Sequence, residues 1–138
     1  LPHLPLTCAE AQNLPYPCVA FDLVLQFTVF SSLLDDAIKA NLAREMLRVL
    51  KPGGMILWYD FWLNPTNPHT RGIRPAETCP EQGRRIRRLF PNCAIELHKI
   101  TLAPPLTRRV VKISWMLALF LESLKIFNTH YLALIRPE

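Results

Sequence analysis

Residues 21–61 read FDLVLQFTVFSSLLDDAIKANLAREMLRVLKPGGMILWYDF, and this stretch decides the fold class. Its two ends, Phe21–Phe27 and residues 55–61, are apolar runs rich in strand-forming residues, which predicts two buried strands. Between them, apolar residues recur every four positions, at Leu34, Ile38, Leu42 and Met46. This spacing predicts a helix with one apolar stripe. Strand, helix and strand at these intervals form a βαβ unit, whose strands we expect to run parallel.

The rest of the chain predicts shorter elements around this unit. We expect a strand at 6–9, a basic helix at 81–90, a strand at 94–102, an apolar helix at 106–127 and a last strand at 131–135. The alternation within 94–102 slips between Leu97 and Ile100, which predicts a β-bulge. The turn Pro52-Gly53-Gly54 is expected to end the preceding helix, because glycine adopts the left-handed conformation and proline cannot continue a helix.

Size and charge limit the classes of protein that fit. The chain has 138 residues, enough for one small domain, and its hydrophobic content of 50% argues against disorder. The excess of positive charge lies in residues 71–112, where ten Lys and Arg face three Glu. Such a stretch can attract nucleic acid or an anionic membrane, and a solvated helix face is the simpler interpretation. Nucleic-acid binding ranks last, because no aromatic residues for base stacking are interleaved with Arg84, Arg85, Arg87 and Arg88.

The cysteines and the first residue bear on cellular context. Cys8, Cys18, Cys79 and Cys93 show no C-x-x-C spacing and no accompanying histidine pair, so no metal site is predicted. The chain shows no secretory signal, and we expect a reduced, cytoplasmic environment with free thiols. The first residue is Leu1 rather than methionine, which is expected of a crop, a processed product or an incomplete reading frame.

Three short motifs resemble those of class I methyltransferases that use S-adenosylmethionine. They are AEAQNLP at 9–15, FDLV at 21–24 and RVLKPGG at 48–54, in the order and spacing of that family. The resemblance implies an α/β, Rossmann-like, doubly wound and mostly parallel sheet, here incomplete and with an added C-terminal apolar helix. It makes residues 1–138 a single partial domain, the C-terminal part of the family's fold. No G-x-G occurs, so we expect the isolated chain to bind the cofactor weakly or not at all and to be inactive.

The resemblance also assigns cofactor contacts to particular residues. Glu10 takes the place of an acidic residue near the adenine amino group, and the backbone N–H of Ala11 would face the adenine ring. Glutamate there is longer than the family's usual aspartate, and a solvated loop carboxylate is the alternative. Gln26 and Phe27 would border the methionine portion, where relatives often have small or polar residues, and ordinary packing is their alternative role.

The acceptor side is expected beyond the carboxyl ends of the two parallel strands, where open α/β sheets bind ligands. Residues 25–30 and 59–64 should therefore face one cleft. Asp60 is the candidate to orient or deprotonate an acceptor hydroxyl, and bracing of a loop is its alternative. The substrate-side candidates are Phe30, Tyr59, Asn64, Asn67 and Arg71. Arg71 could meet an anionic substrate group, although surface turn chemistry would explain it too.

The functional prediction is methyl transfer from S-adenosylmethionine to a small-molecule, glycan or lipid-linked acceptor. Bacterial methyltransferases that act on surface polysaccharide or lipid-linked sugars are similar in the C-terminal region. Residues 106–127 are expected to cover the substrate cleft, to make a peripheral membrane contact or to form a dimer face, with core packing as the alternative. A non-catalytic interaction domain derived from the same fold is the competing functional hypothesis.

Overall fold

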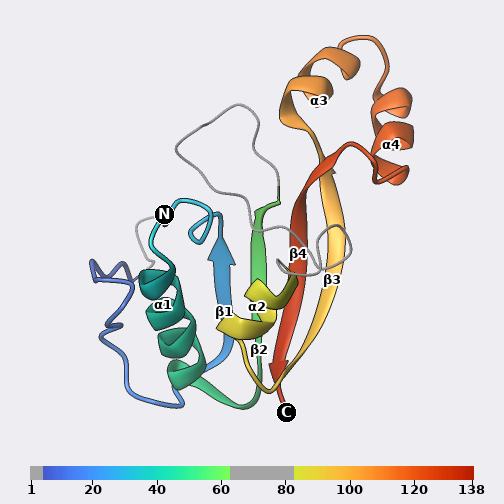
Figure 1. Cartoon of the computed structure of the whole chain (residues 1–138). Helices are drawn as coiled ribbons and strands as arrows, with labels where there is room; N and C mark the ends of the chain where they lie inside the picture. The colour runs from blue at the N-terminus through green and yellow to red at the C-terminus, as the bar shows by residue number, and fades with distance from the viewer. Residues whose placement is uncertain (1–4, 63–82) are drawn as a thin grey trace.

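The predicted βαβ unit forms one side of the sheet. The computed structural model of the chain describes residues 5–62 and 83–138. Strand β1 (Phe21–Phe27), helix α1 (Asp36–Val49) and strand β2 (Leu50–Phe61) follow one another along the chain, as Figure 1 shows. The pairing of β1 with β2 is parallel, and it continues to Phe27 opposite Tyr59. The expected parallel βαβ unit is therefore confirmed.

The four strands lie in the order β1-β2-β4-β3. The last two are β3 (Cys93–Leu102) and β4 (Asn128–Pro137), and β4 runs antiparallel to both of its neighbours. The α/β class with a Rossmann-like, incomplete sheet is confirmed. The expectation of a mostly parallel sheet holds only at β1 and β2, because β3 and β4 form an antiparallel pair that closes the other side of the described sheet.

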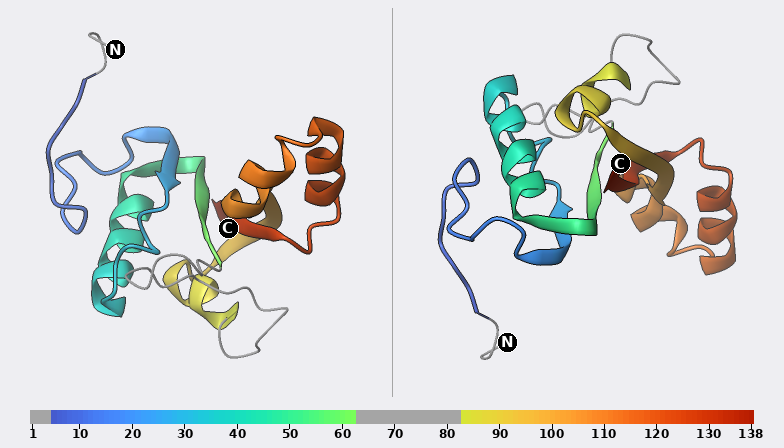
Figure 2. Two further views of the ribbon diagram at one scale, coloured as in Figure 1. Left: turned by 90° about the horizontal axis from the view of Figure 1, so that it is seen from above. Right: turned by 90° about the horizontal axis from the view of Figure 1, so that it is seen from below.

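One face of the sheet carries the hydrophobic core. Helix α1 and the short helix α2 (Gly83–Leu89) both lie on this face (Figure 2). The core joins Met46 of α1 and Ile86 of α2 to Ile56 and Trp58 of β2. On the opposite face, the apolar side chains of β1 remain open to solvent, with exposed fractions of 46%, 53% and 55% at Leu23, Leu25 and Phe27.

The start and end of α1 follow from local hydrogen bonding. The Asp35 carboxylate accepts a hydrogen bond of 2.7 Å from the backbone N–H of Ala37, which caps the first turn. The helix ends at Val49, and Leu50 is already extended. We expected the Pro52-Gly53-Gly54 turn to end the helix, and this expectation is wrong. The turn lies within the first residues of β2, where the pairing with β1 is irregular and Gly53 has a φ of +77°.

Two expectations about strands are wrong. Residues 6–9 form no strand, because Pro5 and the later prolines lack backbone donors and this exposed segment has no neighbouring strand in the described chain. There is also no bulge between Leu97 and Ile100, since the register of β3 against β4 is constant there. The alternation slips because β3 lies at the edge of the sheet, where consecutive residues reach solvent.

The helix expected at 106–127 is two shorter helices, α3 (Pro104–Val110) and α4 (Trp115–Ser123). The break occurs at Ser114, which has an extended backbone and accepts a 3.3 Å hydrogen bond from the N–H of Leu117. Serine favours this capping geometry over a helix interior, so it starts a new helix. Among the helices of the described residues, none is both long and apolar enough to cross a membrane.

Candidate functional site

The carboxyl ends of β1 and β2 lie side by side, as the sequence predicted. Gln26 pairs with Trp58 and Phe27 with Tyr59, and the Thr28 N–H donates a 2.8 Å hydrogen bond to the Tyr59 carbonyl. Thr28 then has a φ of +55°, in the left-handed region that β-branched residues rarely adopt. The chain therefore turns sharply as it leaves β1, and it does so at the end of the sheet where ligands bind in open α/β folds.

The Asp60 carboxylate accepts four hydrogen bonds at this end of the sheet. Its Oδ2 accepts hydrogen bonds from Gln26 Nε2 at 2.9 Å, the Ser31 N–H at 3.2 Å and Trp58 Nε1 at 3.3 Å. Its Oδ1 accepts one from the Phe61 N–H at 2.8 Å. The residue is only 1% exposed, so this carboxylate ties the loop after β1 to β2. Its geometry supports the bracing role more than proton transfer to an acceptor.

Gln26 and Phe27 point to opposite faces of β1. Gln26 is buried, and its amide donates to Asp60, while its Oε1 has no hydrogen-bond partner among the residues that the structure describes. A buried carbonyl oxygen without a donor is unfavourable, and an N–H or O–H group of a ligand would satisfy it. Phe27 faces the open side of the sheet, with its ring centroid 5.8 Å from that of Tyr59.

Of the predicted substrate-side residues, Tyr59 and Phe30 have different surroundings. Tyr59 lies on the open face of the sheet, and its hydroxyl is 2.9 Å from Thr101 Oγ1. Phe30 is fully buried, and its ring packs against Trp58 and Phe90 with centroid distances of 5.3 and 6.3 Å. Phe30 is therefore a core residue and does not contact an acceptor in this arrangement. The other three, Asn64, Asn67 and Arg71, lie outside the described residues.

His130 belongs to this end of the sheet, although the sequence assigned it no role. It pairs with Phe61, stacks on Tyr59 at a centroid distance of 4.8 Å, and its Nδ1 lies 3.1 Å from Thr129 Oγ1. Burial lowers the pKa of the imidazole, and the Asp60 carboxylate opposes that shift in part. No sequence signal could have found it, because its neighbours come from a strand far away in the chain.

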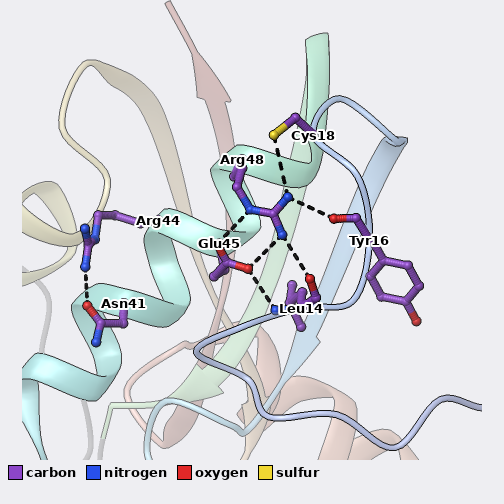
Figure 3. A network of polar contacts seen from close by, with 7 residues as sticks. All are labelled: Leu14, Tyr16, Cys18, Asn41, Arg44, Glu45 and Arg48. Atoms are coloured by element: carbon purple, nitrogen blue, oxygen red, sulfur yellow. Dashed lines mark hydrogen bonds and ion pairs between the residues drawn. The ribbon is translucent and has the colours of Figure 1, made fainter.

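An ion pair on α1 holds the loop that precedes β1 (Figure 3). Arg48 Nε lies 2.7 Å from Glu45 Oε1, and the Arg48 guanidinium also donates to the carbonyls of Leu14 and Tyr16 at 3.0 and 2.8 Å. The Leu14 N–H donates to Glu45 at 2.8 Å. These contacts lower the pKa of Glu45 to about 2, the Arg48 hydrogen bond having the largest effect. The arginine of the RVLKPGG motif therefore positions residues 14–16.

The same loop carries the two residues expected near adenine. Glu10 is exposed, and its carboxylate accepts a 2.9 Å hydrogen bond from Gln12 Nε2. Gln12 in turn accepts one from Asn41 of α1, also at 2.9 Å. Ala11 is half-buried and packs against the core. This segment is thus fixed to the same helix as Arg48, with its acidic group toward solvent.

These residues fit part of the expected cofactor. Glu10 offers an accessible carboxylate for an amino group, and Gln26 offers a buried carbonyl oxygen that lacks a donor among the described residues. A metal is not required by this chemistry, and residues 5–62 and 83–138 contain no group of three His, Cys, Asp or Glu side chains that could hold one.

Comparisons with known proteins support one family. The model of a family described as methyltransferase domain matches residues 2–58. Over 58 residues the chain is 43% identical to a ubiquinone/menaquinone biosynthesis C-methyltransferase of Laribacter hongkongensis, an alignment that covers 42% of this chain and 22% of that enzyme. A Pseudomonas fluorescens enzyme of the same name is 44% identical over 59 residues, covering 43% and 22%. The resemblance to methyltransferases that the sequence motifs indicated is therefore confirmed over residues 2–58.

Solved structures agree with this methyltransferase fold. A SAM-dependent methyltransferase of Methanosarcina mazei superposes with a TM-score of 0.55 at 11% identity, covering 94% of this chain and 65% of that one. Another, from Mesorhizobium loti, gives 0.54 at 15% identity, covering 93% and 67%. The chain thus spans about a fifth of the length of the curated relatives it matches and about two thirds of these solved chains. Both of these solved proteins are named as S-adenosylmethionine-dependent methyltransferases.

Proposed function

We propose that residues 1–138 form one domain that supplies the acceptor side, and part of the cofactor side, of a methyltransferase site. The adjacent carboxyl ends of β1 and β2, joined by the hydrogen bond between Gln26 and Asp60, carry this proposal. Gln26 and Phe27 border the methionine portion of S-adenosylmethionine. Glu10 and Ala11 meet its adenine, supported by the network that fixes residues 10–16 to α1.

The chemistry asks the protein mainly to orient two reactants. The cofactor supplies an electrophilic methyl group on a sulfonium, and the acceptor attacks it in line, so positioning and exclusion of water provide much of the rate. Asp60 serves this by holding Gln26 and the Ser31 backbone in place. Its oxygens already accept four N–H donors, which leaves it poorly placed to receive a proton from the acceptor.

A small, ring-containing molecule fits the acceptor side best. The open face of the sheet there presents the rings of Phe27, Tyr59 and Phe61, and the buried ring of His130 packs against Tyr59 and Phe61. The relatives named for ubiquinone and menaquinone biosynthesis support an acceptor of this kind. A glycan or lipid-linked acceptor would meet the same surface, with Asn64, Asn67 and Arg71 as further contacts, and the cytoplasmic location stays a prediction.

Binding of the cofactor product tests this proposal. Isothermal titration of the 138-residue chain with S-adenosylhomocysteine should give no saturation at micromolar concentration, because the sequence contains no G-x-G to hold the cofactor. A micromolar dissociation constant would contradict this prediction of weak binding. A complete lack of binding at millimolar concentration would contradict the proposed cofactor contacts of Glu10, Ala11, Gln26 and Phe27.

The region between β3 and β4 supports a partner contact as well. Residues 106–127 were expected to cover the cleft, to contact a membrane or to form a dimer face. Many of their apolar side chains are exposed, which favours a contact with something outside the described chain over core packing.

A further inference from the structure

Helices α3 and α4 form a helical hairpin, which comprises residues 103–127. This hairpin exposes far more apolar surface than an ordinary solvated element does. Trp115, Met116 and Phe120 have exposed fractions of 63%, 73% and 58%. Ile113 and Ile126, which flank α4, reach 80% and 73%. Helix α4 is apolar on nearly every side, and such helices are normally buried.

The hairpin is also strongly basic. Arg108, Arg109, Lys112 and Lys125 are all exposed, whereas Glu122 is its single acidic residue. Figure 1 shows α3 and α4 projecting beyond the end of the sheet, away from α1 and α2. Exposed aromatic and aliphatic side chains flanked by lysine and arginine are typical of helices that lie in a membrane interface.

We propose that this hairpin docks on an anionic lipid bilayer. Trp115, Phe120 and the neighbouring aliphatic side chains would enter the region between head groups and acyl chains. Arg108, Arg109, Lys112 and Lys125 would meet the lipid phosphates. A second copy of the chain fits this surface less well, because a symmetric contact would bring the same positive charges together.

Docking would also place the candidate site beside the bilayer. The base of the hairpin is closed by a 2.9 Å hydrogen bond from the Ala103 N–H to the Phe127 carbonyl. The next residue, Asn128, accepts a 2.6 Å hydrogen bond from Trp62, which directly follows β2. The hairpin therefore stands at the same end of the sheet as Tyr59 and Asp60. The membrane contact itself does not depend on methyl transfer.

Vesicle flotation of the whole chain tests this proposal. Vesicles of phosphatidylcholine alone are compared with vesicles that also contain phosphatidylglycerol, at physiological and at high salt. We expect binding to the anionic vesicles that weakens at high salt, together with a blue shift of Trp115 fluorescence. Trp115→Phe should keep the binding and remove most of that shift, since phenylalanine still inserts.

Two double variants separate the apolar and the basic contributions. Trp115→Ser with Phe120→Ser, and Arg108→Glu with Arg109→Glu, should each weaken binding about tenfold or more. The matched control is Leu23→Ser with Leu25→Ser, which removes apolar side chains of similar exposure from the open face of β1. This control should leave binding unchanged, and circular dichroism verifies that every variant keeps its secondary structure.

Three outcomes would overturn the proposal. One is equal binding to neutral and anionic vesicles with no effect of salt, and another is loss of binding in the β1 control rather than in the hairpin variants. The third is concentration-dependent dimerisation in sedimentation velocity that the hairpin variants abolish, with no vesicle binding. That result would assign the surface to a second copy of the chain.

Discussion

At the scale of single residues, the buried carboxylate of Asp60 joins the loop after β1 to the end of β2. Asp60→Asn replaces one oxygen by an NH₂ group, which in either orientation faces at least one N–H donor. We expect the free energy of unfolding to fall by roughly 1–3 kcal/mol, the range for a buried donor left unpaired. Urea denaturation measures it, and Asp22→Asn at an exposed ion pair with Lys51 should change little. Equal stability of wild type and Asp60→Asn would contradict the bracing role.

His130 makes stability depend on pH. Its pKa in the folded chain is lowered from the ordinary value of 6.5, mainly by burial, so the folded state favours the neutral imidazole. The stability that the buried, neutral imidazole contributes is therefore fully present above pH 6.5. It is lost as the pH falls through the lowered pKa of the folded chain, because the unfolded chain takes up the proton at a higher pH. The urea midpoint of the wild type should therefore decrease as the pH is lowered from mildly alkaline to mildly acidic. His130→Gln should flatten that decrease, while the exposed His98→Gln should retain it; a slope unchanged in His130→Gln would contradict this.

The sequence located some residues of this site and missed others for physical reasons. Gln26, Phe27 and Tyr59 follow from their places at the ends of two apolar runs in one βαβ unit. His130 does not, because its contacts depend on the pairing of β2 with β4, which are separated by many residues. Phe30 was assigned to the substrate side, yet the turn at Thr28 directs it into the core.

At the scale of elements, the start of β2 depends on a close approach of two strands. A Cβ at Gly54 would lie 2.9 Å from the Asp22 carbonyl oxygen and 2.9 Å from Leu50 Cγ, both tighter than normal contacts. We expect Gly54→Ala to lower the free energy of unfolding by roughly 1–3 kcal/mol, as overpacking does. Gly53→Asn is the control, because asparagine tolerates the left-handed conformation and a Cβ there meets nothing within 4 Å. Equal stability of Gly54→Ala and wild type would show that the strands can separate.

Element boundaries were predicted well where the pattern was long and less well where single residues decide. The apolar stripe of α1 and the runs of β1 and β2 gave the right elements. The helix at 106–127 was divided by Ser114, whose capping hydrogen bond outweighs the apolar run that follows it. The slip in β3 reflected its edge position, a property of strand order that no local pattern contains.

At the scale of the whole molecule, the described sheet has one covered and one open face. Helices α1 and α2 cover the core side of the sheet (Figure 2). On the other side, Leu23, Leu25 and Phe27 remain about half exposed. The candidate site lies at the end of this sheet, beside the open face. The proposed contacts with the cofactor would come from β1, β2 and the loop that Arg48 holds, which is why we expect weak but localised binding.

Amide chemical-shift mapping tests this central claim most directly. The ¹⁵N-labelled chain is titrated to millimolar concentration with S-adenosylhomocysteine. The account predicts shifts that gather at residues 10–12, 26–30 and 59–62, with little change in α3 and α4. Shifts centred instead on residues 51–54, at the opposite end of β2, or no shifts at all, would contradict it.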